Sequence, residues 1–327
     1  MSSRLSLALA SGVVALPERG RVLLLRPPAD IDLSGLPSDE VIAVHGFKPD
    51  HDALASRGLP MASEIDGPAE AAVVFATRAK ALTHDLLAQA AAAVGAGGPI
   101  IVDGAKADGI DSLLKRLRGI TQVGEVFSKA HGKCFQITAP QTLPDDWRAL
   151  PRDVDGFRTA PGVFSADGVD PGSALLVAHL DALSGRVCDL GAGWGYLSSH
   201  ILAQSAVTEV TLVEAEALAL DCARVNVADP RARFHWADAT RWEGGPYDAV
   251  VMNPPFHTGR KADPALGRSF VQVASRLLTP RGRLIMVANR HLPYEATLAE
   301  SFGDTMVRAD QGGYKVIEAT RPKRRPT

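Results

Sequence analysis

The sequence predicts an α/β protein made of two tandem copies of one parallel-sheet fold, and three observations carry this prediction. An apolar run at 186–190 is followed by a glycine-rich turn and a helix, the order that opens a nucleotide-binding α/β sheet. Further strand-like runs at 209–213, 232–236 and 247–252 each end beside a polar residue. Finally, the same order of elements recurs on both sides of a proline-punctuated stretch at 139–155.

The glycine turn follows Asp189 and contains Gly191, Gly193 and Gly195. Glycine lets the backbone approach a ligand closely and adopt positive φ angles. A helix is expected next, because apolar residues recur at helical spacing. The residues expected to share its buried face are Leu197, Ile201 and Leu202.

Acidic side chains follow the second and third of these strands. Glu214 is placed to bond the two ribose hydroxyls of a nucleoside, and Asp238 to accept from an adenine amino group. The glycine spacing alone is weak evidence, since a structural glycine-rich turn has the same appearance. The combination of turn and acids at successive strand ends is stronger.

The fourth strand ends at Asn253-Pro254-Pro255-Phe256. A Pro-Pro pair offers no backbone N–H and fixes φ, so the strand stops abruptly. The turn leaves an amide oxygen at Asn253, a carbonyl at Pro254 and an aromatic ring at Phe256. These groups suit a planar substrate that bears an NH₂, although an ordinary proline turn at a strand end remains the alternative.

Together these strand ends resemble the class I S-adenosylmethionine-dependent methyltransferases, in the branch that methylates exocyclic or amide nitrogens. Dinucleotide dehydrogenases are the main competitor. Their glycines are spaced GxGxxG, whereas this turn is GxGxG, and they have no use for the Asn-Pro-Pro-Phe segment.

The flanking residues narrow the resemblance. Pro161-Gly162-Val163-Phe164-Ser165 and Asp170-Pro171-Gly172-Ser173 precede the glycine turn, and His257 with Gly259 follow Phe256. This arrangement is similar to that of the two-domain bacterial ribosomal RNA guanine-N2 methyltransferases. The similarity covers nearly the whole chain, tightly over 157–290 and loosely over 70–138. One departure is Ala192, where family members often have Cys.

The resemblance implies S-adenosylmethionine as cofactor and no metal. Its methionine part is expected against Asp189 and the three turn glycines, its ribose on Glu214, and its adenine on Asp238 and the Ala239 N–H. We expect catalysis by Asn253 and the Pro254 carbonyl, which accept from the guanine amine while Phe256 stacks on the base.

Four further residues are expected on the substrate side. Phe164 is a second wall of the base pocket or, equally, a core aromatic. His257 is a proton acceptor or a turn histidine bonded to backbone. Arg260 and Lys261 are expected to contact RNA phosphates, the alternative being a solvated loop. The C-terminal cluster from Arg321 to Arg325 allows the same two interpretations.

The proline-punctuated stretch at 139–155 predicts a first domain over 1–140 and a second over 155–327. The resemblance makes these two tandem class I methyltransferase (Rossmann-like) domains. The first is degenerate: Arg26-Pro27-Pro28 replaces the glycine turn, His45 stands where Glu214 stands, and Phe75-Ala76-Thr77 replaces Asn-Pro-Pro. It is expected to dock RNA, through Lys106, Lys129 and Lys133, or to support folding.

Composition fits such a protein. The chain has 327 residues, 46% of them hydrophobic, and a formal net charge of −2, so RNA contact needs local cationic groups. No apolar run is long enough to span a bilayer. The first segment, from Arg4 to Leu16, weakly resembles a signal peptide, but an amphipathic first helix is the favoured interpretation. Three cysteines without metal-ligand spacing suggest reduced, packed thiols. We therefore expect a cytoplasmic monomer acting on ribosomal RNA or a ribosomal subunit, without a membrane partner.

Three alternatives remain open. Enzymes that methylate protein glutamine amides, and DNA adenine-N6 methyltransferases, also present an Asn-Pro-Pro-Tyr or Asn-Pro-Pro-Phe segment to a planar NH₂. The duplicated first half and the segment at 161–165 favour ribosomal RNA over both. A non-catalytic RNA-binding module built on the same fold is disfavoured by the intact motifs of the second half.

Overall fold

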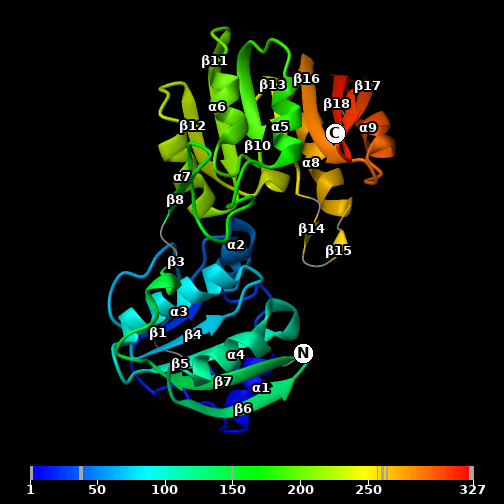
Figure 1. Cartoon of the computed structure of the whole chain (residues 1–327). Helices are drawn as coiled ribbons and strands as arrows, with labels where there is room; N and C mark the ends of the chain where they lie inside the picture. The colour runs from blue at the N-terminus through cyan, green and yellow to red at the C-terminus, as the bar shows by residue number, and fades with distance from the viewer. Residues whose placement is uncertain are drawn as a thin grey trace. The chain divides into compact units, whose positions relative to one another are not determined.

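The computed structural model describes residues 3–36, 40–148, 151–255, 257–258, 261–262 and 264–323. The chain divides into two compact units, Met1–Leu150 and Pro151–Thr327 (Figure 1). Each unit is an α/β sandwich whose central sheet is largely parallel.

The first unit contains one seven-stranded sheet in the order β3-β2-β1-β4-β5-β7-β6. Its strands are β1 (Val22–Leu25), β2 (Val41–Val44), β3 (Met61–Ala62), β4 (Ala71–Phe75), β5 (Pro99–Ala105), β6 (Val123–Lys129) and β7 (Gly132–Thr138). Its helices are α1 (Arg4–Ala10), α2 (Lys48–Ser56), α3 (Lys80–Val94) and α4 (Ile110–Arg118), with short 3₁₀ turns η1 (Lys106–Asp108) and η2 (Asp145–Trp147).

The second unit contains a seven-stranded sheet in the order β12-β11-β10-β13-β16-β18-β17. The strands are β10 (Gly185–Leu190), β11 (Val207–Glu214), β12 (Ala232–Trp236), β13 (Tyr247–Met252), β16 (Leu278–Asn289), β17 (Phe302–Gln311) and β18 (Tyr314–Pro322). The helices are α5 (Pro171–Ala178), α6 (Tyr196–Leu202), α7 (Ala217–Asn226), α8 (Pro264–Leu277) and α9 (Glu295–Ser301), with the 3₁₀ turn η3 (Ala239–Arg241). Two small hairpins pair β8 (Arg152–Val154) with β9 (Phe157–Thr159) and β14 (His257–Thr258) with β15 (Lys261–Ala262).

The two sheets share one topology, which confirms the predicted duplication. Five strands of each sheet run parallel, and the last two pair antiparallel at one edge. In both, the order reverses beside the first strand, at β1 and at β10. In open α/β sheets a ligand binds at the carboxyl ends of the strands beside such a reversal.

Alternating strand residues pack on opposite faces of each sheet, as a parallel sheet covered on both sides requires. In the second unit Val187 and Val251 belong to one core cluster, whereas Cys188 and Val250 belong to the other. The predicted helix after the glycine turn is α6, and its expected apolar face is buried there. All three cysteines are free and buried, as the sequence suggested.

The division between the two units falls between residues 150 and 151, within the proline-punctuated stretch at 139–155. Trp147 is fully buried in the first unit's core and stacks on His84 at a centroid distance of 4.4 Å. Arg152 to Val154 pair with 157–159 in the second unit. A tryptophan of this size buries too much apolar surface to lie in a solvated linker.

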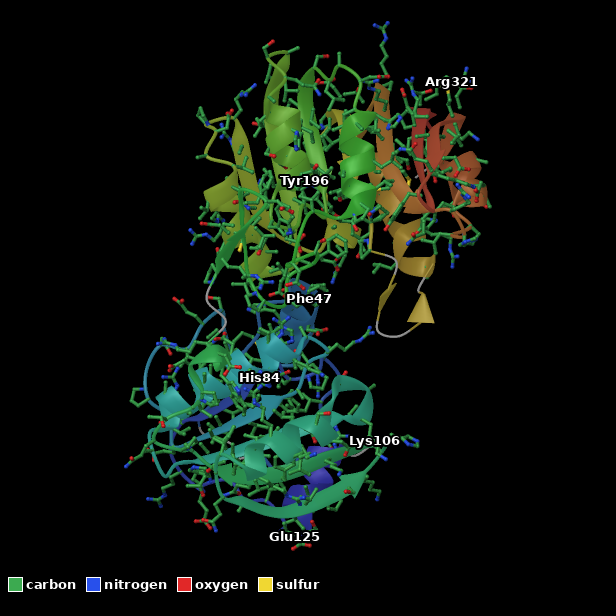
Figure 2. All side chains as sticks on the ribbon, viewed as in Figure 1. Phe47, His84, Lys106, Glu125, Tyr196 and Arg321 are labelled. Carbon is green, nitrogen blue, oxygen red and sulfur yellow. The ribbon has the colours of Figure 1, made fainter. Side chains whose placement is uncertain are left out.

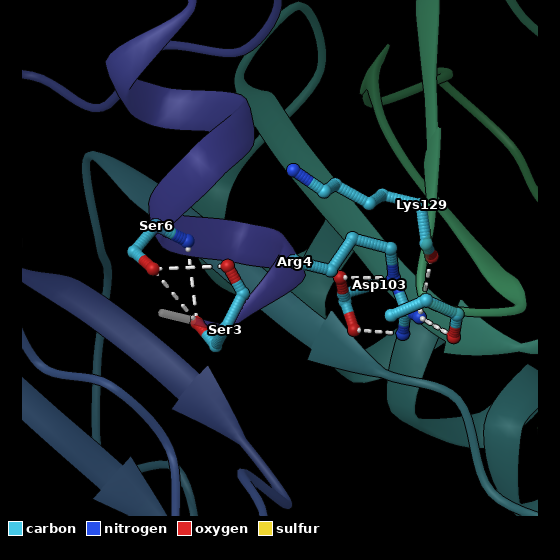
Figure 3. Close-up of polar contacts among 6 residues, drawn as sticks. Ser3, Arg4, Ser6, Asp103 and Lys129 are labelled. Atoms are coloured by element: carbon cyan, nitrogen blue, oxygen red, sulfur yellow. Dashed lines mark hydrogen bonds and ion pairs between the residues drawn. The ribbon is translucent and has the colours of Figure 1, made fainter. Parts of the chain in front are cut away.

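An ion pair connects the N-terminal helix of the first unit to its sheet (Figure 3). Arg4 in α1 donates from Nε and Nη2 to the two carboxylate oxygens of Asp103 in β5, at 2.9 and 2.6 Å. Its Nη1 also donates to the Lys129 and Ala130 carbonyls, both at 3.4 Å. Both charged side chains are nearly buried, and the forked contact links α1 to β5 and to the β6–β7 hairpin.

No helix among the described residues is both long and apolar enough to cross a membrane.

Candidate active site

The candidate site begins at the turn between β10 and α6. Gly191, Gly193 and Gly195 all have positive φ, at 84°, 54° and 89°. A Cβ at Gly195 would lie 2.8 Å from Val227, so the helix start leaves no room for a side chain. A Cβ at Gly193 would meet nothing within 4 Å, so this part of the turn faces open space. The backbone is therefore available to a ligand at Gly193.

Glu214, the last residue of β11, shapes that turn. Its Oε2 accepts from the Gly193 N–H at 2.7 Å, and its Oε1 accepts from the Glu216 N–H at 2.8 Å. Burial raises the pKa of Glu214, and these backbone donors oppose the rise. Each carboxylate oxygen has a second lone pair with which it can accept from a ligand hydroxyl.

Asp189 lies at the end of β10 with its side chain fully buried. Its Oδ2 accepts from Ser198 Oγ at 2.6 Å, whereas Oδ1 has no hydrogen-bond partner among the described residues. Burial raises the pKa of Asp189 to about 7, although the Ser198 hydroxyl favours the charged form. An unpartnered buried carboxylate oxygen is costly unless a cationic or donor group completes it.

Asp238 and Ala239 lie just beyond the third strand, β12. The Asp238 side chain caps η3, accepting from the Thr240 N–H at 2.8 Å and its hydroxyl at 2.7 Å. Ala239 is buried in the core. These two residues are held at the carboxyl end of the sheet by the turn that they form.

Asn253 follows β13, and its amide nitrogen makes two hydrogen bonds. Nδ2 donates to Asp170 Oδ2 and to Ser173 Oγ, each at 2.9 Å. Both partners belong to the start of α5, where Asp170 caps the helix by accepting from the Ser173 N–H at 2.8 Å. Pro254 is buried next to Asn253.

Phe164 is an exposed aromatic, 56% accessible, and therefore not a core residue. Its carbonyl accepts from the Trp194 indole N–H at 3.0 Å, which ties its loop to the glycine turn. The next residue, Ser165, has a φ of 54°, a conformation that is uncommon for a non-glycine residue. The Trp194 ring also contacts the Tyr196 ring edge to face (Tyr196 is labelled in Figure 2).

One hollow unites these groups. Gly191, Gly193, Phe164 and Asn253 share its wall, and Glu214 reaches it through Gly193. Asp189 lies near the end of β10, and Asp238 and Ala239 follow the end of β12, at the same carboxyl edge of the sheet. The complete lining is Phe164, Ser165, Asp170, Ser173, Gly191, Ala192, Gly193, Trp194, Tyr196, Leu197 and Asn253.

Several predicted residues cannot be placed in full. Phe256 and Arg260 lie outside the described residues. His257 and Lys261 lie on the β14–β15 hairpin directly after the Asn-Pro-Pro turn, where His257 pairs with Ala262, and their side chains are not described.

Sequence reasoning did not assign roles to Asp170, Ser173, Trp194 or Ser198, although each contacts a predicted site residue. Asp170-Pro171 carries the signature of a helix start, with an N-cap residue followed by proline. That signal predicts a cap, but it does not predict that the same carboxylate reaches Asn253.

The sheet order, the glycine turn after the first strand, the acid after the second and the Asn-Pro-Pro turn after the fourth define the class I methyltransferase fold. Residues 155–318 match the methyltransferase small domain family. Ribosomal RNA small subunit methyltransferase C of Pseudomonas syringae pv. syringae is 32% identical over 320 residues, covering 93% of this chain and 96% of that protein. The protein of the same name from a Shewanella strain is 32% identical over 256 residues, covering 75% of each chain.

Among solved structures, the 16S rRNA N2 guanine methyltransferase (RsmC) of T. thermophilus, in complex with AdoMet and guanosine, superimposes with a TM-score of 0.80. The two are 26% identical, and the match covers 98% of this chain and 92% of that one. The chain belongs to the ribosomal RNA small subunit methyltransferase C family.

Proposed function

We propose that this protein transfers the methyl group of S-adenosylmethionine to the exocyclic N2 amine of a guanine in small-subunit (16S) ribosomal RNA. The observation that carries the proposal is the hollow in which the glycine turn faces Asn253. The lining of that hollow includes both the glycine turn and Asn253, which supports the proposal because methyl transfer requires the methyl donor and the amine to be held close together. The family membership and the guanosine-bound relative support the choice of base.

The residues present fit the cofactor. The unpartnered Asp189 Oδ1 suits the ammonium group of its methionine part, and the open backbone at Gly193 suits a close approach. Glu214 retains lone pairs for the ribose hydroxyls, and Asp238 with the Ala239 N–H serves the adenine. When bound, the cofactor supplies an activated methyl group on a sulfonium.

Asn253 and the Pro254 carbonyl prepare the amine. A guanine N2 is a poor nucleophile because its lone pair is delocalised into the ring. Acceptors at the Asn253 Oδ1 and the Pro254 carbonyl bind its two hydrogens, favour pyramidalisation and aim the lone pair. As positive charge develops on the nitrogen, the same fixed dipoles stabilise it. The charged product nitrogen is strongly acidic and releases one proton to water. The chain therefore contributes alignment and electrostatics, and no strong acid or base is needed.

Aromatic and basic residues hold the base and its strand. Phe256 stacks on the guanine, Phe164 forms a second wall, and each base–aromatic stack is worth ~1–3 kcal/mol. The exposure of Phe164 beside the hollow supports its part. His257, Arg260 and Lys261, on the segment that follows, contact the RNA. The target must be flipped or already single-stranded, because its N2 is inaccessible within a paired helix.

One chain supplies every group named above, so a monomer is sufficient for the reaction. Bacterial ribosomes are assembled in the cytoplasm, so the proposal also places the protein there. Sedimentation of the purified protein tests the first point, and fractionation of cells tests the second.

The first unit has a different part in this proposal. Its counterpart of the site lacks the glycine turn, the ribose acid and the Asn-Pro-Pro turn. It therefore serves RNA docking or folding support, without cofactor. Of the lysines considered for docking, Lys133 is paired with Asp111 at 2.7 Å.

The direct test is methylation in vitro with labelled S-adenosylmethionine. Purified 16S RNA, small subunits and large subunits are offered separately, and nucleosides are analysed by mass spectrometry. N2-methylguanosine in small-subunit material is the expected product. Label on protein glutamine, on DNA adenine or on large-subunit RNA would overturn the substrate assignment. Binding of RNA without any transfer would instead indicate a non-catalytic module.

A further inference from the structure

The two hydrogen bonds of the Asn253 amide nitrogen determine which way this side chain faces. The carboxylate of Asp170 can only accept, so the side of the amide that faces it must be Nδ2. Ser173 Oγ receives the second N–H, also at 2.9 Å. An amide nitrogen has two hydrogens, and both are now used. The carbonyl oxygen Oδ1 is left as the group that meets the substrate.

The support is itself rigid. Asp170 Oδ2 also accepts from the Ser173 N–H, which fixes the carboxylate to the first turn of α5. At Gly172, between them, a Cβ would lie 2.9 Å from Tyr314 Cε1 and 3.0 Å from Asp170 Oδ2. Ser173 is itself buried. The start of α5 therefore packs closely against Tyr314 of β18 and is hydrogen-bonded to Asn253.

We propose that Asp170 and Ser173 are positioning residues for methyl transfer, holding the Asn253 amide with its oxygen toward the substrate amine. The inference rests on the proposed function, because it requires an N–H donor as substrate. A flipped amide would direct its own N–H groups at the amine hydrogens, so donor would meet donor. The pair therefore also selects a substrate that offers N–H at this position over one that offers a carbonyl oxygen.

A purely structural role is the competing explanation, because Asp170 is also the N-cap of α5. The two roles separate with Asp170→Ser. Serine is among the best N-cap residues, so the helix start is retained. The serine side chain is one bond shorter than that of aspartate, so its hydroxyl does not reach the Asn253 amide. Asp170→Asn is the conservative variant, since its side-chain oxygen can accept in place of the carboxylate.

The experiment compares Asp170→Ser, Asp170→Asn and Ser173→Ala by steady-state methylation of small-subunit RNA. Misalignment of a reacting group by about 1 Å costs about a hundredfold in rate. For Asp170→Ser we expect kcat to fall by about that factor, with cofactor Kd and melting temperature close to those of the unchanged protein. Ser173→Ala should lose less, because one of the two bonds remains. Asp170→Asn should recover most of the activity.

Ser275→Ala is the matched control. It removes a helical serine hydroxyl that donates to a backbone carbonyl at 2.9 Å and lies outside the lining of the hollow. Its kcat should equal that of the unchanged protein. Unaltered kcat in Asp170→Ser, or a loss of cofactor affinity as large as the loss of kcat, would overturn the positioning role.

A measurement on the amide itself separates this inference from the proposed function. In ¹⁵N-labelled protein, the two side-chain N–H signals of Asn253 are identified by their absence in Asn253→Ala. Asp170→Ser should shift both signals and speed their exchange with water, whereas Ser275→Ala should leave them in place. Unmoved signals would refute the inference even if the enzyme is active. Failure of the unchanged protein to methylate guanine N2 would refute the proposed function alone.

Discussion

The two units fold the same way, and they differ where their strands end. Glu214 is the last residue of β11 and His45 directly follows β2, the corresponding strand of the first unit. Each side chain accepts from the backbone N–H two residues on, at Glu216 and at Phe47. In the second unit the acceptor is a carboxylate with further lone pairs. In the first it is an imidazole whose pKa burial lowers to about 3, so it is neutral. The local turn has been kept while the group that would bind ribose hydroxyls has been lost.

The same contrast holds one strand over. Strands β10 and β1 hold the same place in their sheets. The second-to-last residue of β10 is Asp189, which has an unpartnered oxygen, and the second-to-last residue of β1 is the fully buried Leu24. The first unit does contain a buried carboxylate, Asp103, but Arg4 of its own chain completes it. The buried carboxylate of the second unit therefore keeps one oxygen free for a ligand, whereas that of the first unit is bound on both oxygens by Arg4.

The largest expected effect follows from breaking the internal partner. Arg4→Met leaves Asp103 buried without its counterion, and removing one member of a buried pair costs ~3–5 kcal/mol. Denaturant unfolding should show this loss. The double variant Arg4→Met with Asp103→Leu should recover most of it, since an apolar pair replaces the charges. A full-sized loss in the double variant would mean that the contacts of Arg4 with the β6–β7 hairpin dominate.

Asn253→Ala should have the next largest effect, because it removes the side-chain acceptor for the substrate amine. The corresponding segment of the first unit, Phe75-Ala76-Thr77, has no such amide side chain. Loss of one preorganised dipole lowers kcat by about 10²–10³. Cofactor affinity should stay within about twofold, since the amide faces the substrate amine. Calorimetry beside initial rates measures both quantities. An equal loss in binding and turnover would assign Asn253 to the cofactor instead.

Glu214→Ala should weaken the cofactor by ~1.5–3 kcal/mol, the worth of hydrogen bonds to a charged group. Part of the loss will come from the Gly193 N–H, which also depends on this carboxylate. Glu214→Gln keeps one acceptor and should lose less. If both variants bind the cofactor with unchanged affinity, Glu214 does not bind the ribose, and the replacement by His45 does not explain why the first unit binds no cofactor.

Asp189 predicts a smaller effect that depends on pH. Its folded pKa of about 7 lies above the ordinary value, so without ligand the carboxyl keeps its proton up to that pH. Between about pH 4 and 7 the unfolded chain has lost this proton, so stability without cofactor should fall as pH rises. A cationic group favours the ionised form. Cofactor affinity should therefore drop as pH falls below 7, by at most about tenfold per unit. Asp189→Asn should remove this slope in calorimetric titrations.

The last prediction is one of no change. Because the first unit satisfies its own buried carboxylate and lacks a glycine turn, calorimetry should give one cofactor per chain. His45→Glu should leave that stoichiometry unaltered, since a single acid does not restore the turn. Two cofactors per chain in the unchanged protein would contradict the division of roles between the units.

Local sequence patterns predicted the strands of the second unit well. The run 247–252 coincides with β13, and 232–236 coincides with β12, because turn residues bound each apolar stretch. The helix with Leu197 and Ile201 on its buried face was also predicted correctly. Such features depend on neighbours in sequence, which a single chain displays.

What could not be predicted depends on residues that are distant in sequence. No periodicity connects Asn253 with Asp170, or Arg4 with Asp103, and only the folded sheet brings these side chains together. The exposure of Phe164 was equally undetermined, because an aromatic between Val163 and Ser165 fits a core or a surface loop. The short β14–β15 hairpin after the Asn-Pro-Pro turn carries too few residues for a pattern.

The shared strand order has a consequence for how such a protein changes over time. The core side chains lie along the strands and on the helices that cover them, whereas the groups of the site lie at the strand ends and on the turns just past them. Mutations that abolish the chemistry of one copy therefore leave its interior intact and escape removal by misfolding. One copy of a duplicated domain can therefore acquire a new function while the other copy retains the original one. Turns exchanged between the copies should likewise alter ligand preference without rebuilding either interior.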